Sequence, residues 1–217
     1  MKCLIVAGGD TSDEFASQVV KNGGYEIIIA ADSGMEFLYR VGIIPDIIVG
    51  DFDSADADIL DYYREQEQIE ICVLNPVKDD TDTESAIREA IDRGATDITI
   101  IGGTGTRLDH VLGNITLLGI GLEEGVSITL LDPHNCIRMY DRPVTIKKEE
   151  QYGQYISVLP YSDFVENVTI TGMKYPLNNY RMGGFNSLGV SNEIVDEEAR
   201  ISFDKGIILL IESRDEY

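Results

Sequence analysis

Six short apolar runs in the N-terminal part of this chain constrain its fold more than any other feature of the sequence. They read CLIVA (3–7), EIIIAA (26–31), DIIVG (46–50), EICVL (70–74), DITIIG (97–102) and VSITLL (126–131). Because each run is apolar at consecutive positions, it predicts a strand that is covered on both faces. Helical patterns lie between several of the runs. Strands alternating with helices predict a mostly parallel, doubly wound α/β sheet.

Capping patterns predict where the helices begin. A Ser or Thr followed three residues later by Glu is the capping-box signature, and it occurs at Thr11, Ser33 and Thr81. Gly94 is the predicted stop of the third helix. A later helix is predicted from an apolar stripe formed by Leu108, Val111, Leu112, Ile115 and Leu118.

The pattern changes after about residue 135. Strand-like segments follow, with Gly, Pro, Asn and Asp in the connections: CIRMY, VTIKK, QYISVLP, NVTITG, ARISF and IILLIE. They predict an antiparallel β-sandwich. We therefore expect two closely joined domains, residues 1–135 and residues 136–217.

Composition excludes several classes of function. The chain of 217 residues carries 17 Lys and Arg against 39 Asp and Glu, a net charge of −22. Such a charge repels nucleic acids and anionic membranes. Cys3, Cys72 and Cys136 lack metal-site spacing and predict buried free thiols. No segment approaches the ~18 apolar residues of a membrane span, so the sequence predicts a cytoplasmic protein.

The acidic residues gather where the predicted strands end. The loops after the first five runs read Gly8-Gly9-Asp10, Asp32-Ser33-Gly34, GDFDS (50–54), DDTDTE (79–84) and GGTGTRLD (102–109). In a parallel sheet these loops share one edge, where open α/β sheets bind ligands. That edge would carry Asp10, Asp32, Asp51, Asp53, Asp82 and Asp109.

This edge predicts a site for a metal ion and phosphate. In extended backbone Asp51 and Asp53 would point the same way, with Phe52 turned away to pack. Crowded carboxylates repel one another and suit Mg²⁺. The Gly-rich loop would bring backbone amides to phosphate oxygens, and Arg107 would bind a phosphate bidentately. Each motif alone has a simpler reading, a helix cap or a solvated surface pair, so the prediction rests on their convergence.

Several enzyme classes lack their motifs. The chain has no G-x-x-x-x-G-K-[ST] loop and no G-x-S-x-G elbow, and Leu108 stands where a dinucleotide fingerprint needs a third glycine. His110 and His134 are the only histidines. Neither has a paired nucleophile visible in the sequence, and for His110 we favour a surface or capping role.

With these motifs the chain resembles the thiamine pyrophosphokinase family, its bacterial members in particular. The resemblance covers nearly the whole chain. It is carried by ADSG (31–34), PDIIVGDFDS (45–54), DDTDTE (79–84), GGTGTRLDH (102–110) and SLGVSNE (187–193).

The resemblance implies a kinase-type transferase that moves the diphosphoryl group of ATP to the hydroxyl of thiamine and releases AMP. It implies an ATP- and Mg²⁺-binding domain followed by a thiamine-binding β domain, in a homodimer with the active site at the subunit interface. Its implied metal ligands are Asp51, Asp53 and Asp82, which with Asp32 form the catalytic set. Implied ATP contacts are Gly9, Asp10, Asp32, Ser33, Gly103, Thr104, Arg107 and Asp109; implied thiamine contacts are Ser191 and Asn192.

Alternatives remain open at this point. A second Mg²⁺-dependent reaction on a similar sheet, nucleotidyl transfer or phosphate hydrolysis, would release pyrophosphate or ADP. A non-catalytic sensor would bind ATP without turnover. Asp82 and Asp53 are both candidates for the proton acceptor. The chain has no Trp to stack on thiamine, and Tyr180 and Phe185 are the candidates to replace one.

Overall fold

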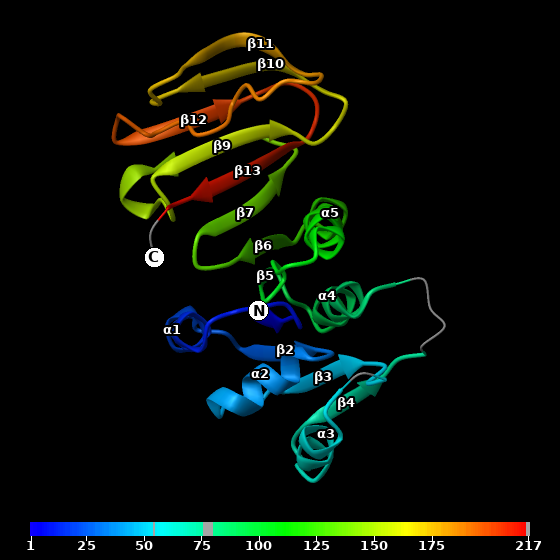
Figure 1. The fold of residues 1–217 in the computed structure, drawn as a ribbon. Helices are drawn as coiled ribbons and strands as arrows, with labels where there is room; N and C mark the ends of the chain where they lie inside the picture. Colours follow the sequence, from blue (N-terminus) through cyan, green and yellow to red (C-terminus); the bar gives the residue numbers. More distant parts are fainter. Residues whose placement is uncertain (54, 76–79, 216–217) are drawn as a thin grey trace. The chain divides into compact units, whose positions relative to one another are not determined.

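The computed structural model describes residues 1–53, 55–75 and 80–215 and divides into two compact units, Met1–Asp132 and Pro133–Tyr217 (Figure 1). Ser54 of the GDFDS motif and Asp79 of the DDTDTE motif lie outside the described residues. Each unit is described by itself below.

A parallel sheet forms the centre of the first unit. Its strands lie in the order β4-β3-β2-β1-β5-β6, and every neighbouring pair is parallel. This confirms the predicted sheet. The strands are β1 (Lys2–Val6), β2 (Ile27–Ala31), β3 (Ile47–Gly50), β4 (Glu70–Val73), β5 (Asp97–Ile101) and β6 (Ser127–Leu131).

Helices cover both faces of this sheet, as a doubly wound fold requires. They are α1 (Asp13–Gly23), α2 (Gly34–Val41), α3 (Ala57–Arg64), α4 (Asp82–Asp92) and α5 (Leu108–Glu124). Phe15 of α1, Leu38 of α2 and Tyr63 of α3 share one buried cluster with Leu4 and Ile48 of the sheet. Helix α4 packs over β1, β2 and β3, and α5 packs beside it over β6; both lie across the sheet from α1 and α2 (Figure 1).

Two elements of the first unit differ from the prediction. Helix α3 was not predicted, because no capping box precedes its eight residues ADILDYYR: Ile59, not Glu or Gln, stands three residues after Asp56. Its cap is Asp56, whose side chain accepts from the backbone N–H groups of Asp58 and Ile59. Strand β4 was expected to be covered on both faces, yet Glu70 and Val73 are exposed. The reason is that β4 is the edge strand.

The capping predictions were partly wrong. Thr81 does cap α4, accepting from the N–H of Glu84, and Gly94 follows that helix with a φ of 88°. The cap of α1, however, is Ser12 rather than Thr11: its hydroxyl accepts from the N–H of Phe15 at 3.2 Å. Ser33 has helical dihedral angles and makes no side-chain capping bond.

The second unit is the predicted sandwich. Strands β7, β13 and β9 are antiparallel neighbours in that order, and a separate antiparallel sheet has the order β11-β10-β12-β8. Both contribute to one buried cluster that includes Val158, Ile170, Ile201 and Leu210. The strands are β7 (Asn135–Tyr140), β8 (Val144–Lys147), β9 (Tyr155–Pro160), β10 (Phe164–Thr171), β11 (Leu177–Gly183), β12 (Glu198–Ser202) and β13 (Ile208–Ser213).

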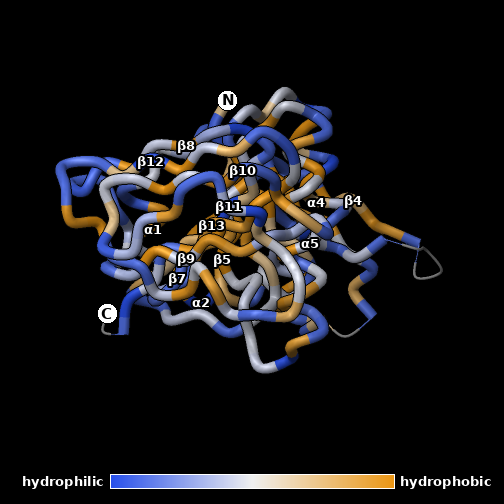
Figure 2. Tube along the Cα trace, turned by 90° about the horizontal axis from the view of Figure 1, so that it is seen from above, coloured by the Kyte–Doolittle hydropathy of each residue, from blue (hydrophilic) through white to orange (hydrophobic). Residues whose placement is uncertain are grey.

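The hydropathy of each strand explains whether it could be predicted from the sequence. Figure 2 shows hydrophobic residues along β13, whose first three residues are buried. Strand β11 was not predicted, because most of its residues are polar and exposed. Across the described part of the chain, no helix has both the length and the apolar character needed to cross a membrane.

The corrected cap of α1 gives a stability prediction. Ser12→Ala should lower the free energy of unfolding by about 1 kcal/mol, because it leaves an N–H of the first turn without its acceptor. Thr11→Val is the matched control. The Thr11 hydroxyl is buried and has no hydrogen-bond partner among the described residues, so its removal should be neutral or stabilising. Urea denaturation followed by circular dichroism measures both, and a larger loss in Thr11→Val would contradict the assignment.

Candidate active site

A cavity of about 320 Å³ opens at the carboxyl edge of the parallel sheet. It is lined by the loops that follow β1, β2 and β5 and by the first turn of α4, so the predicted convergence of these loops is present. The predicted site residues among its lining are Gly9, Asp10, Asp32, Ser33, Asp82, Gly103 and Arg107. Asp51, Asp53, Thr104 and Asp109 are not part of the lining.

Asp32 is the most constrained acidic residue of this cavity. It follows β2 in the left-handed region, with a φ of 48°, and its N–H donates to the Val49 carbonyl of β3 at 2.8 Å. Its Oδ1 atom is buried and has no hydrogen-bond partner among the described residues. A buried carboxylate oxygen without a protein partner is costly, and a bound ion is one of the ways to satisfy it.

The charges around Asp32 show which loops meet here. Burial raises the pKa of Asp32, against a hydrogen bond from the Ser33 backbone, and the negative charges of Asp82, Asp51 and Asp53 raise it further. Residues that perturb a pKa through charge lie within electrostatic reach. Asp51 and Asp53 therefore act on Asp32 through their charge, although they do not line the cavity.

The geometry of that loop differs from the prediction. Phe52 has a φ of 60°, so the backbone between Asp51 and Asp53 is not extended. Instead, the N–H of Asp53 donates to Asp51 Oδ1 at 3.1 Å, which makes a tight turn. Phe52 does pack against the core, as expected. Gly50 makes room for it, because a Cβ there would lie 3.0 Å from the Phe52 ring.

Glycines let the loops after β1 and β5 approach each other closely. The N–H of Gly9 donates to the Gly102 carbonyl at 2.7 Å. A Cβ on Gly9 would collide with that carbonyl, and one on Gly102, whose φ is 68°, would collide with the Ala7 carbonyl. The two loops meet where the strand order reverses, because β1 pairs with both β2 and β5. Doubly wound folds bind nucleotides at such switch points.

Arg107 and Asp109 form an exposed pair at the start of α5. Arg107 Nη2 lies 2.7 Å from Asp109 Oδ2, and its Nε donates to Oδ1 at 3.2 Å. These bonds, with the N–H of His110, lower the pKa of Asp109 to about 2. Asp109 thus orients the guanidinium of Arg107, which lines the cavity and can bind an anion there.

The donors of this site fit a hard divalent cation. Oxygen ligands from carboxylates are those that Mg²⁺ prefers, and the orphaned Asp32 oxygen lies within reach of the charges of Asp51, Asp53 and Asp82. Among the described residues, however, these carboxylates do not bring three ligand atoms within 4.8 Å of one another, so metal binding by Asp51, Asp53 and Asp82 stays a prediction.

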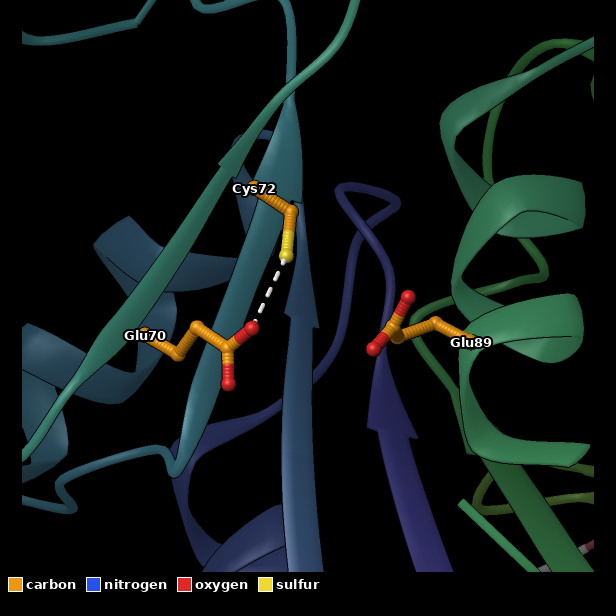
Figure 3. Close-up of side chains that lie close together, drawn as sticks. All are labelled: Glu70, Cys72 and Glu89. Carbon is orange, nitrogen blue, oxygen red and sulfur yellow. Dashed lines mark hydrogen bonds between the residues drawn. The ribbon is translucent and has the colours of Figure 1, made fainter. Parts of the chain in front are cut away.

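A second acidic group is a poorer candidate for a metal. Glu70 and Cys72 of β4 and Glu89 of α4 bring their ligand atoms within 4.8 Å of one another (Figure 3). Arg93, however, binds Glu70 at 2.7 Å and Glu89 at 2.6 Å. A guanidinium already balances these carboxylates, so we interpret the group as an ion-pair cluster.

The predicted thiamine contacts lie in the second unit. Ser191 is exposed, has a φ of 56°, and its N–H donates to Ser157 Oγ at 3.0 Å. Asn192 is 5% exposed. Its amide accepts from the N–H of Tyr175 at 2.9 Å and donates to the carbonyl of the same residue at 2.8 Å. Asn192 thus builds the loop through its side chain, and its contact with thiamine stays a prediction.

The exposed aromatic residues of this unit include both candidates for stacking on thiamine. Tyr180 on β11 is 39% exposed, and Phe185 in the following loop is fully exposed. Tyr175, next to Asn192, is 59% exposed. No pattern in the sequence pointed to Tyr175.

Two further residues of the cavity were missed or undervalued. His110, for which a surface role was favoured, is indeed exposed and also lines the cavity. Asn114 also lines it, and its Nδ2 donates to the Gly103 carbonyl at 2.8 Å. A signal was available for Asn114, because it is a polar residue between Val111 and Ile115 in the apolar stripe of a predicted helix.

The fold and the site define a nucleotide-binding α/β protein with an acidic edge suited to a divalent cation. Comparison with known proteins specifies the family. The profile described as "Thiamin pyrophosphokinase, catalytic domain" matches residues 20–130, and "Thiamin pyrophosphokinase, vitamin B1 binding domain" matches residues 143–208. The chain belongs to the thiamin pyrophosphokinase family, which confirms the resemblance.

Individual members of this family are similar to the chain over its full length. Thiamine pyrophosphokinase of Bacillus subtilis is 33% identical over 99% of this chain and 100% of its own. The crystal structure of thiamine pyrophosphokinase from Bacillus subtilis matches this structure with a TM-score of 0.88 and 34% sequence identity. The match covers 99% of this chain and 100% of the other. A thiamin pyrophosphokinase family protein from Enterococcus faecalis has a TM-score of 0.84 and 33% identity, with full coverage of both chains.

Proposed function

We propose that this protein is a thiamine diphosphokinase, which transfers the diphosphoryl group of ATP to the hydroxyl of thiamine and yields thiamine diphosphate and AMP. The observation that carries the proposal is the acidic, glycine-lined cavity at the switch point of the parallel sheet, around Asp32 and Asp82. Membership of the family supports the choice of substrates.

The reaction exchanges one bond to phosphorus for another. The hydroxyl oxygen of thiamine forms a bond to the β-phosphorus, and the bond from that phosphorus to the oxygen shared with the α-phosphate breaks. AMP leaves with that oxygen. The hydroxyl proton passes to a carboxylate, for which Asp82 and Asp53 are the candidates. Such chemistry depends mainly on positioning and on the neutralisation of charge.

The carboxylates of the edge supply the metal site in this proposal. Asp51, Asp53 and Asp82 would hold Mg²⁺, and Asp32 adds a buried oxygen that has no hydrogen-bond partner among the described residues. When bound, the ion neutralises negative charge on the polyphosphate. This arrangement explains how an anionic substrate binds to a chain with a net charge of −22.

The remaining groups of the cavity receive ATP. Arg107 offers a guanidinium to the phosphates, held in place by Asp109. The loops after β1 and β5, with Gly9, Asp10, Gly103 and Thr104, offer backbone close to the nucleotide because their glycines carry no side chain. Ser33 adds a hydroxyl from the β2 loop.

Thiamine is the cationic substrate of this proposal. Ser191 and Asn192 contact it from the β domain, and its positive thiazolium ring is attracted by the acidic surface of the protein. The competing reactions, nucleotidyl transfer and phosphate hydrolysis, are not favoured, because the matched family is defined by both a catalytic and a vitamin B1 binding domain.

We further propose a cytoplasmic homodimer with the active site at the subunit interface. If the site is shared between subunits, the average molecular mass and the specific activity should fall together on dilution, because the monomer lacks part of the active site. Sedimentation equilibrium and activity measured over the same concentration range test this. A species with the 24.0 kDa mass of one chain and full specific activity would contradict the shared site.

Chromatography of the products tests the reaction itself. Incubation with Mg²⁺, ATP and thiamine should give AMP and thiamine diphosphate in equal amounts. Asp51→Asn should lower the rate by roughly 100-fold or more, because it removes a charged ligand of the metal. Asp92→Asn is the control, since Asp92 is an exposed acid at the end of α4 and should leave the rate unchanged.

The products also separate the alternatives. Pyrophosphate would indicate nucleotidyl transfer, and ADP would indicate hydrolysis or transfer of one phosphate. ATP binding with no thiamine-dependent AMP would indicate a sensor. Any of these three results would refute the proposed reaction.

A further inference from the structure

Asn114 is a buried polar residue on the helix that flanks the nucleotide cavity. It is 9% exposed, and it lies on α5 among apolar neighbours of which Leu118 and Ile120 are also buried. Burying an amide costs free energy unless its hydrogen bonds are made. An apolar residue at this position would avoid that cost, so the amide must supply something that an apolar side chain does not.

What it supplies is a partner for the Gly103 carbonyl. Asn114 Nδ2 donates to this carbonyl oxygen at 2.8 Å. The Gly103 backbone is pressed against the sheet, because a Cβ at this position would come within 2.5 Å of Leu130 Cδ1 on β6 and 3.3 Å of Ile100 Cγ2 on β5. A backbone carbonyl packed so closely needs a hydrogen-bond donor, and Asn114 is the donor.

The carbonyl matters because of the loop in which it lies. Residues 102–107 lead from β5 to α5 and carry Arg107 at the edge of the cavity. Gly102 at the start of this loop is bound to the N–H of Gly9 at 2.7 Å. The loop is therefore tied to the β1 loop through Gly102 and to α5 through Gly103.

We infer that Asn114 is a positioning residue for the nucleotide. By holding the Gly103 carbonyl, it keeps the loop 102–107 and Arg107 in the shape that receives the phosphates of ATP. A carbonyl released from this bond would present the negative end of a peptide dipole beside an anion site. This inference rests on the proposed function, since it takes ATP as the ligand of the cavity.

Steady-state kinetics of Asn114→Leu test the inference. Leucine keeps the approximate volume and removes the donor without adding charge. We expect KM for ATP to rise roughly ten-fold, and KM for thiamine to change less than about two-fold, as for the loss of one buried hydrogen bond near the ATP site. Thr116→Val is the matched control, because it removes a 3.0 Å bond from a side chain to the Leu112 carbonyl on the same helix; both KM values should stay at wild type.

A second readout follows the loop directly. Amide hydrogen exchange of the ATP-free protein should be faster at residues 103–107 in Asn114→Leu and unchanged in the β domain. If Asn114→Leu does not fold, Asn114→Ser replaces it, and the same changes are expected at smaller size. An unchanged KM for ATP, or equal increases of both KM values, would overturn the inference.

Two different measurements test this inference and the proposed reaction. Absence of thiamine-dependent AMP from the wild-type protein would refute the reaction. The role of Asn114 is read from ATP affinity, by calorimetric titration of wild type and variant with Mg²⁺ and ATP. Equal affinities would overturn it even when the wild type is fully active.

Discussion

Repulsion among carboxylates at the carboxyl edge of the parallel sheet is the constraint on which the site depends. The topology carries the ends of β2 and β3 and the start of α4 to this edge, and with them Asp32, Asp51, Asp53 and Asp82. Burial and these like charges raise the pKa of Asp32. In the absence of a cation, repulsion among these carboxylates opposes folding. The apolar cores must therefore supply the free energy that offsets this repulsion. A bound metal ion turns the same repulsion into an attraction for a polyphosphate.

The backbone around these carboxylates is built for close approach. Asp32 and Phe52 both have positive φ values, a conformation that costs roughly 1–2 kcal/mol for residues with a Cβ. Phe52 offsets part of this cost by packing its ring on the core. Strain of this kind persists where the surrounding structure holds it and is concentrated at functional sites. Asn114 contributes to the same site, because its Nδ2 donates to the carbonyl of Gly103 in the glycine loop that lines the cavity.

Much of the fold followed from the sequence, because the physics behind it is local. Consecutive apolar residues form strands buried on both faces, and a parallel sheet then places the ends of those strands at one edge. That reasoning brought Asp32 and Asp82 to one cavity without any knowledge of contacts. The failures came from interactions that no spacing rule contains. Helix α3 lacks a capping box and strand β11 is too polar to show a period, and their places are set by tertiary packing.

The errors at the site have equally specific causes. The alternation rule for Asp51 and Asp53 assumes extended backbone, and the left-handed Phe52 breaks that assumption. Thr11 and Ser12 are adjacent and chemically alike, so the capping pattern could not choose between them. In each case a backbone angle or a hydrogen bond decides what residue type alone leaves open.

The free energy of unfolding of wild type and Asp32→Asn, with and without Mg²⁺, tests most directly whether the crowded carboxylates exist to hold a metal. Because the folded-state pKa of Asp32 is raised, ionised Asp32 destabilises the metal-free protein above that pKa, and the penalty disappears as the pH falls toward the ordinary value. In chelator at pH 8, Asp32→Asn should therefore be the more stable protein, and the difference should shrink on acidification. With Mg²⁺ the wild type should gain more stability and the order should reverse. A wild-type protein that gains no stability from Mg²⁺ would contradict a metal site at this edge.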